Sequence, residues 1–129
     1  MGLAERRAVE LVKETEFKMF EGKVKEICGV DVKLTFDWSA VESHKDCVWI
    51  CENKKFDYYM WDNITTALTA ITADNMGKEA VKNGLKAINM IPVAGELEFT
   101  SGVLTVRNDL TGNGAYDAGQ IQSKLESGL

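Results

Sequence analysis

One histidine and two cysteines are the soft metal ligands that lie closest together in the chain. His44, Cys47 and Cys51 follow one another at steps of three and four residues, which on a helix would place them on one face as zinc ligands. In a strand, Cys47 and Cys51 would lie about 13 Å apart, too far to share one ion. The run between them is rich in strand-forming side chains, although its neighbours also suit a helix. We predict a strand within residues 39–55, and buried thiols rather than a zinc site.

A glycine-rich loop near the C-terminus carries oxygen-bearing side chains at regular positions. They are Asp109, Thr111, Asn113, Asp117 and Gln120. The spacing resembles the calcium loop of EF-hand and dockerin proteins, and that resemblance implies a calcium ion held by these oxygens. Gln120 stands where those loops have a bidentate Glu, Thr111 stands where they have Asp or Asn, and the preceding segment has the pattern of a strand. We therefore favour an ordinary glycine-rich turn, with weak calcium binding as the alternative.

Aromatic side chains gather in the middle of the chain. They are Trp49, Phe56, Tyr58, Tyr59 and Trp61. Such rings dominate protein cores and protein interfaces alike, and Tyr and Trp add a polar group that a partner can use. Consecutive Tyr58 and Tyr59 cannot both point inward from a strand, so we expect at least one of them at a surface. We predict a binding surface formed by Trp49, Tyr58, Tyr59 and Trp61.

The common catalytic motifs do not occur in the sequence. The chain has a single histidine and no nucleophile elbow, phosphate-binding loop, dinucleotide fingerprint or H-E-x-x-H pair. Asp31 and Asp37 share the polar face of a predicted strand, but they would lie about 20 Å apart, too far for acid and base cooperation. These absences favour a non-catalytic protein without a cofactor.

Composition and charge narrow the partners. The chain has 129 residues, 45% of them hydrophobic and 27% charged, which favours one globular domain over residues 1–129. Its net charge of −5 repels nucleic acid and anionic lipid surfaces and suits a basic protein partner. No apolar leader or membrane span is evident, and the cysteine count is odd, so we expect a cytoplasmic protein with reduced thiols.

Two changes of hydrophobic period divide the chain. Apolar residues recur at helical spacing over residues 3–28, with Leu11 and Met19 on the apolar face and Gly29 as the stop. The period then changes to two over residues 30–38, which predicts a strand with one wet face, typical of antiparallel sheets. Helices are predicted after Asp62 and Asp74, the second of them burying Met76, and a last helix over residues 116–127.

Residues 86–107 are predicted to form a three-stranded meander with turns at Ala94-Gly95 and Ser101-Gly102. The second turn sets Phe99 opposite Leu104, and the first sets Met90 opposite Phe99. Both turns place one set of side chains on a single face: Met90, Pro92, Leu97, Phe99, Leu104 and Val106. The predicted fold class is therefore α+β, a mostly antiparallel sheet of about four to five strands packed on one face by helices, in the order α-β-(β)-α-α-β-β-β-α.

Three functions remain open from the sequence. The first is a protein-binding or assembly module, homodimeric in one form, that acts through the aromatic surface. The second is a small-molecule-binding protein or enzyme with an aromatic-walled pocket. The third is weak calcium binding at residues 109–120.

Overall fold

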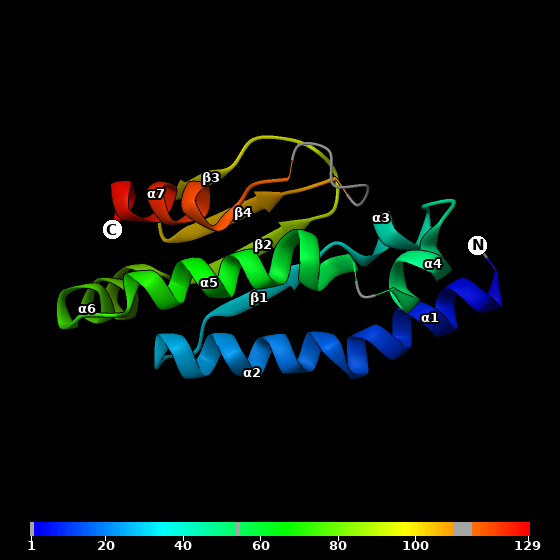
Figure 1. Cartoon of the computed structure of the whole chain (residues 1–129), viewed down its shortest axis with the longest axis horizontal. Coiled ribbons are helices and arrows are strands. Elements are labelled where there is room, and N and C mark those ends of the chain that lie inside the picture. The colour runs from blue at the N-terminus through cyan, green and yellow to red at the C-terminus, as the bar shows by residue number, and fades with distance from the viewer. Residues whose placement is uncertain (1, 54, 110–114) are drawn as a thin grey trace.

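The computed structural model describes residues 2–53, 55–109 and 115–129. The described chain folds into a four-stranded sheet and helices that cover one of its faces (Figure 1), which confirms the α+β class. The helices are α1 Leu3–Glu14, α2 Glu16–Cys28, α3 Trp38–Glu42, α4 Cys47–Glu52, α5 Asp62–Ile71, α6 Asn75–Gly84 and α7 Ala118–Gly128, and a π-helical turn, η1, spans Asp57–Trp61. The strands are β1 Lys33–Phe36, β2 Ala87–Ile91, β3 Glu98–Thr100 and β4 Val103–Arg107.

The long N-terminal helix is divided at Thr15. The backbone there leaves the helical region, with φ −115° and ψ −88°, and α1 and α2 run end to end with a bend between them (Figure 1). The Thr15 hydroxyl donates to the Leu11 carbonyl at 2.7 Å, a local bond that competes with the regular helix ladder. Gly29 ends α2 at φ 69°, as predicted, because a left-handed stop favours glycine.

The sheet is mixed, so the prediction of a mostly antiparallel sheet with a C-terminal meander is wrong. Its strand order is β1-β2-β4-β3; β1, β2 and β4 run parallel, and only β3 is antiparallel. Pro92 cannot donate a ladder hydrogen bond, and the chain leaves the sheet after Ile91. It returns as β3 on the far side of β4, which leaves β2 and β4 free to pair with each other.

The second predicted turn is correct. Ser101 and Gly102 have φ of 53° and 79°, the left-handed pair that a tight hairpin turn requires, and Phe99 lies opposite Leu104 as expected. The predicted pairing of Met90 with Phe99 is wrong, because Met90 pairs with Val106. Met90, Leu104 and Val106 are nevertheless buried together, since a period of two assigns the face whichever strand is the partner.

The predicted strand over residues 30–38 is confirmed only in its middle, as the short edge strand β1, which runs parallel to β2. The strand predicted within residues 39–55 is wrong, because α3 and α4 occupy this segment. Asp37 caps α3 by accepting from the Ala40 N–H at 3.4 Å. Helical spacing also buries Cys47, Ile50 and Cys51 together, and this burial outweighs their strand propensity. Both helices pack beside α1 beyond the end of β1 (Figure 1).

The core lies between the sheet and α2, α5 and α7. The predicted helix after Asp62 is confirmed as α5, and its four apolar residues Ile64, Ala67, Leu68 and Ile71 are buried. The α7 helix contributes Ile121 and Leu125, each 0% exposed. Asp74 caps α6 as predicted, through the Gly77 N–H at 2.7 Å, but Met76 is exposed rather than buried. Among the described residues no helix is long and apolar enough to cross a membrane.

Candidate functional site

The predicted aromatic surface is divided by the fold, because Trp61 is part of the core. It is 1% exposed and stacks on Phe20 at 5.4 Å and on Phe56 at 5.3 Å between ring centroids. Its indole nitrogen is buried and has no hydrogen-bond partner among the described residues. Trp61 therefore anchors the packing of α2 against η1 and presents no ring face to a partner.

Trp49 and Tyr59 do come together, around a lysine that sequence reasoning did not link to them. The Lys55 ammonium lies 4.9 Å from the Trp49 ring centroid and 5.6 Å from that of Tyr59. Trp49 is 55% exposed, so the cation–π contact is a surface feature. The side chain of Tyr58 lies outside the described residues. Two of the four predicted residues thus share one surface.

The three predicted zinc ligands do not converge. Cys47 and Cys51 lie one turn apart on α4 with their thiols hydrogen-bonded to each other, but the Nδ1 atom of His44 accepts from the Asp46 N–H at 3.0 Å. Burial raises the pKa of Cys47, and it raises the pKa of Cys51 to about 12, so both thiols stay protonated at neutral pH. Among the described residues no group of three His, Cys, Asp or Glu side chains is arranged to hold a metal ion.

Part of the predicted calcium loop serves the start of α7. Asp117 accepts from the Gln120 N–H at 2.8 Å, and the Gln120 side chain accepts from the Asp117 N–H at 2.9 Å. This reciprocal capping box occupies both side chains in starting the helix. Thr111 and Asn113 lie outside the described residues, and Asp109 follows the end of β4.

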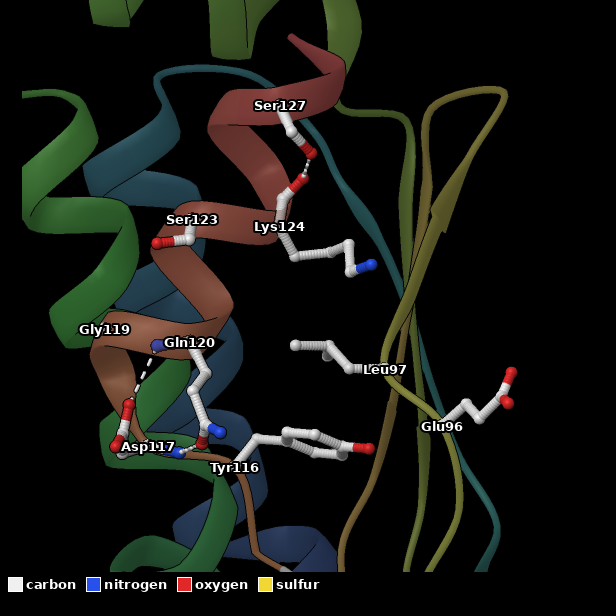
Figure 2. A pocket seen from close by; sticks show the side chains of 9 residues that line it. All are labelled: Glu96, Leu97, Tyr116, Asp117, Gly119, Gln120, Ser123, Lys124 and Ser127. Atoms are coloured by element: carbon white, nitrogen blue, oxygen red, sulfur yellow. Dashed lines mark hydrogen bonds between the residues drawn. The ribbon is translucent and has the colours of Figure 1, made fainter.

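A broad hollow separates α7 from the segment that leads into β3. This open groove has a volume of about 980 Å³, and Figure 2 shows Tyr116, Leu97 and Lys124 reaching into it. The Tyr116 hydroxyl donates to the Gly95 carbonyl at 2.6 Å. With the capping box at one end, much of its polar lining is already used to hold α7 against the sheet, so we do not assign this groove a small-molecule ligand.

A second hollow follows the N-terminal helices and was not predicted. An apolar section of about 510 Å³ lies between α1 and α4, and a cleft of about 120 Å³ lies where α2 meets η1 and α5. The first is lined by Ala4, Arg7, Ala8, Leu11, Val12, Glu16, Val48, Cys51 and Glu52. The second is lined by Thr15, Glu16, Met19, Phe20, Lys23, Asp57, Trp61, Asp62 and Thr65. Glu16 lines both, so they adjoin, and together we call them the N-terminal groove.

Exposed apolar side chains and acidic groups characterise the N-terminal groove. Leu11 is 62% and Met19 64% exposed, unusual for large apolar side chains on one helical stripe. Four carboxylates line the groove against two basic side chains, Arg7 and Lys23. The sequence already contained an indication of this groove. Leu11 and Met19 belong to the apolar face predicted for residues 3–28, and the neighbouring elements do not cover the full width of that face.

Comparison of the chain with protein-family models, curated proteins and solved structures finds no match.

Proposed function

We propose that this protein is a non-catalytic protein-binding module that holds an amphipathic helical segment of a partner in the N-terminal groove. The observation that carries the proposal is the junction of the two hollows at Glu16, which makes one elongated groove. Leu11 and Met19 lie exposed along it. Grooves of this kind commonly receive the apolar face of a helix.

The dimensions of the groove suit such a segment. Its lining on the N-terminal helices extends from Ala4 to Lys23, a path of about 28 Å at the helical rise per residue. A partner helix of about five turns would cover it. The bend at Thr15 makes the path curve, so the fit favours a segment that bends or is short.

The charge of the groove favours a basic partner. Glu16, Glu52 and Asp62 are three of its carboxylates, and the cations are fewer. The chain as a whole carries a net charge of −5. This charge attracts a basic segment at long range and repels an acidic one. The association rate should therefore fall as salt is added.

The narrow cleft supports a protein partner better than a free small molecule. Its volume of about 120 Å³ equals roughly four water molecules in the liquid, whereas pockets for whole ligands usually span about 300–1,000 Å³. Phe20 and Trp61, both almost fully buried, are part of its lining, and Asp62 contributes a carboxylate. One side chain of a partner, anchored in this cleft, is the occupant that its size favours.

The proposal is tested with a synthetic amphipathic peptide of about 18 residues that carries leucines on one helical face and lysines on the other. We expect saturable binding with a Kd of about 10–100 µM by isothermal titration calorimetry. Leu11→Glu places a charge on the apolar wall and should weaken binding at least about tenfold, and Leu11 is exposed enough for the fold to tolerate it.

Met76→Glu is the matched control, because Met76 is also an exposed apolar residue on a helix and lies outside the groove. It should leave peptide binding unchanged. Equal binding of a peptide whose leucines are scrambled around the helix would contradict the proposal. So would an unchanged Kd in Leu11→Glu, or no binding up to about 1 mM peptide.

A further inference from the structure

We infer that the free edge of β3 binds an extended segment of a partner protein, which adds to the sheet as a further strand beside α7. β3 is the last strand in the order β1-β2-β4-β3, and β4 is its neighbour among the described strands. An edge strand presents backbone N–H and C=O groups that form a template for another extended chain. These groups determine what kind of molecule the edge can bind.

The hairpin turn shows which backbone groups of β3 point outward. Both residues of the two-residue turn after Thr100 have positive φ, and a turn of this type joins the Thr100 carbonyl to the Val103 N–H. Hydrogen-bonded and non-hydrogen-bonded pairs alternate along an antiparallel ladder. The next pair, Phe99 with Leu104, is therefore of the second kind. The N–H and C=O of Phe99 point away from β4, out of the sheet edge.

Leu97 continues this edge by two residues. Within the described parts of the chain, neither Leu97 nor Phe99 has a backbone hydrogen bond to a loop or a helix. The residue before Leu97 is already engaged, because the Glu96 carbonyl accepts from Arg107 at 2.9 Å. Leu97 and Phe99 thus offer two donors and two acceptors, enough to hold an added strand of about five residues.

The broad hollow beside α7 accommodates the side chains of such a strand. Figure 2 shows Leu97 and Lys124 reaching into this hollow from the sheet and from α7. Leu97 is 9% exposed, and Phe99 packs against the core from the same edge. Side chains of an added strand alternate between its two faces, so every second one enters the hollow, beside apolar groups.

Lys124 indicates which charge suits the hollow. Among the described residues it forms no ion pair. Asp117 also lines the hollow, but its carboxylate accepts from the Gln120 N–H at 2.8 Å and caps α7, and Glu96 points away from α7 (Figure 2). A carboxylate of the partner therefore suits Lys124. The occupant is an extended segment with apolar side chains and one carboxylate on the face that enters the hollow.

An NMR titration of the isotope-labelled protein tests this inference. The probe is a synthetic peptide of about nine residues, in which valines and lysines alternate and a glutamate replaces the central valine. The amide signals of Leu97 and Phe99 should shift and their hydrogen exchange with solvent should slow. Because β3 is short, we expect a Kd of about 100 µM to 1 mM. Unchanged amide signals up to about 3 mM peptide would overturn the inference.

Methylation of the peptide backbone supplies the matched control. In an antiparallel added strand, the residues that share the face of Phe99 also direct their N–H groups toward β3. Methyl groups on the amides of the valines and the glutamate should therefore weaken binding at least about tenfold, whereas methyl groups on the lysine amides should not change it. The opposite preference would place the strand on the same edge in parallel orientation. Equal affinity of the two methylated peptides would overturn the inference.

Three protein variants separate this edge from the N-terminal groove. Lys124→Glu should weaken binding about fivefold by facing the peptide glutamate with a like charge, and Lys82→Glu, the same change on the exposed side of α6, should leave it unchanged. Leu11→Glu should also leave it unchanged, because alternating residues give this peptide no apolar helical face. Failure of this inference and failure of the proposed function are thus seen separately.

Two other occupants of the edge or the peptide would be visible in the same spectra. Shifts at Leu11 and Met19 in place of Leu97 and Phe99 would mean that the peptide lies in the N-terminal groove. A Phe99 signal that moves with protein concentration alone would mean that a second copy pairs with the edge. Either result would overturn the inference.

Discussion

The N-terminal groove and the sheet face opposite the helices, which we call the open sheet face, are both uncovered, but they differ in shape and charge. The groove is concave, apolar and acidic, with Leu11 and Met19 exposed along it. The open sheet face carries the partly exposed side chains of β2 and β4, from Ala87 and Val103 at one end to Ile91 and Arg107 at the other, and Arg107 pairs there with Glu98. The acidic groove therefore attracts a basic partner, whereas the open sheet face has no such excess of carboxylates.

The two surfaces also arise from different features of the fold. The groove follows from the break at Thr15, which sets α1 at an angle to α2. The open sheet face stays uncovered because the short helices α3 and α4 pack beside α1 rather than under the sheet (Figure 1). Substitutions in the core and matched substitutions on the two surfaces test this comparison.

The largest effect is expected at Asn108, which joins η1 and the segment before α7 to the end of β4. It is 1% exposed; its amide donates to the Tyr59 carbonyl at 2.5 Å and accepts from the Tyr116 N–H at 3.0 Å. Asn108→Ala leaves both backbone groups without this partner and should lower the free energy of unfolding by about 3 kcal/mol. Urea denaturation measures the loss.

Asn89→Ala is the matched control for Asn108→Ala, since Asn89 is also an asparagine but lies on β2 and on the open sheet face. It should change the free energy of unfolding by no more than about 0.5 kcal/mol in a dilute sample. Equal losses in the two variants would mean that the open sheet face is part of a packed core, and the contrast between the two surfaces would fail.

A second prediction compares two valines of β4 that point to opposite faces. Val106 is 0% exposed, whereas Val103 is partly exposed on the open sheet face. Val106→Ala should cost about 2 kcal/mol through lost burial and a small cavity, and Val103→Ala less than about 1 kcal/mol. Urea unfolding of both variants at low protein concentration measures the difference, and a larger loss at Val103 would contradict the assignment of the faces.

The sequence predicted which side chains are buried more accurately than it predicted how strands pair. Met90, Leu104 and Val106 are buried together because alternation depends only on the period of the strand. Strand order depends on the path of the chain between strands. No residue near Pro92 indicates that β3 lies on the far side of β4. The same limit applies to residues 39–55, where burial against α1 outweighed strand propensity.

The candidate site was less predictable than the fold. Composition identified the aromatic segment, yet Phe56 and Trp61 lie in the core while Trp49 is exposed, and only tertiary packing separates them. The N-terminal groove brings Glu16 together with Glu52 and Asp62 from later elements. Only the exposed apolar pair Leu11 and Met19 was recognisable beforehand, as excess width on an amphipathic helix.

A smaller effect is expected from pH at the floor of the groove. Burial raises the pKa of Cys51 to about 12, whereas the ordinary pKa of a thiol is about 9. Above that pH the unfolded chain loses a proton that the folded chain keeps, so stability is full below about pH 9 and falls by roughly 1 kcal/mol per pH unit as the pH rises toward 12.

Cys51→Ala should make that decline shallower. The measurement is the urea midpoint of both proteins at pH 7, 9 and 10, from which the free energy of unfolding at each pH follows. Only the slope is compared, because the variant also loses packing at every pH. Parallel curves for the two proteins across this range would show that the Cys51 thiol ionises equally in both states.

The smallest effect on stability is expected from Glu98→Gln on the open sheet face. The Glu98–Arg107 pair is solvent-exposed, at 48% and 29% of the side-chain surface, and such pairs contribute about 0–1 kcal/mol. Arg107 also keeps its bond to the Glu96 carbonyl at 2.9 Å. The melting temperature of dilute protein should therefore barely move. Thermal unfolding of the variant and the wild type at low and high salt measures the difference. A loss of more than about 1 kcal/mol in the free energy of unfolding would contradict the description of this pair as solvent-exposed and weaken the contrast between the open sheet face and the core.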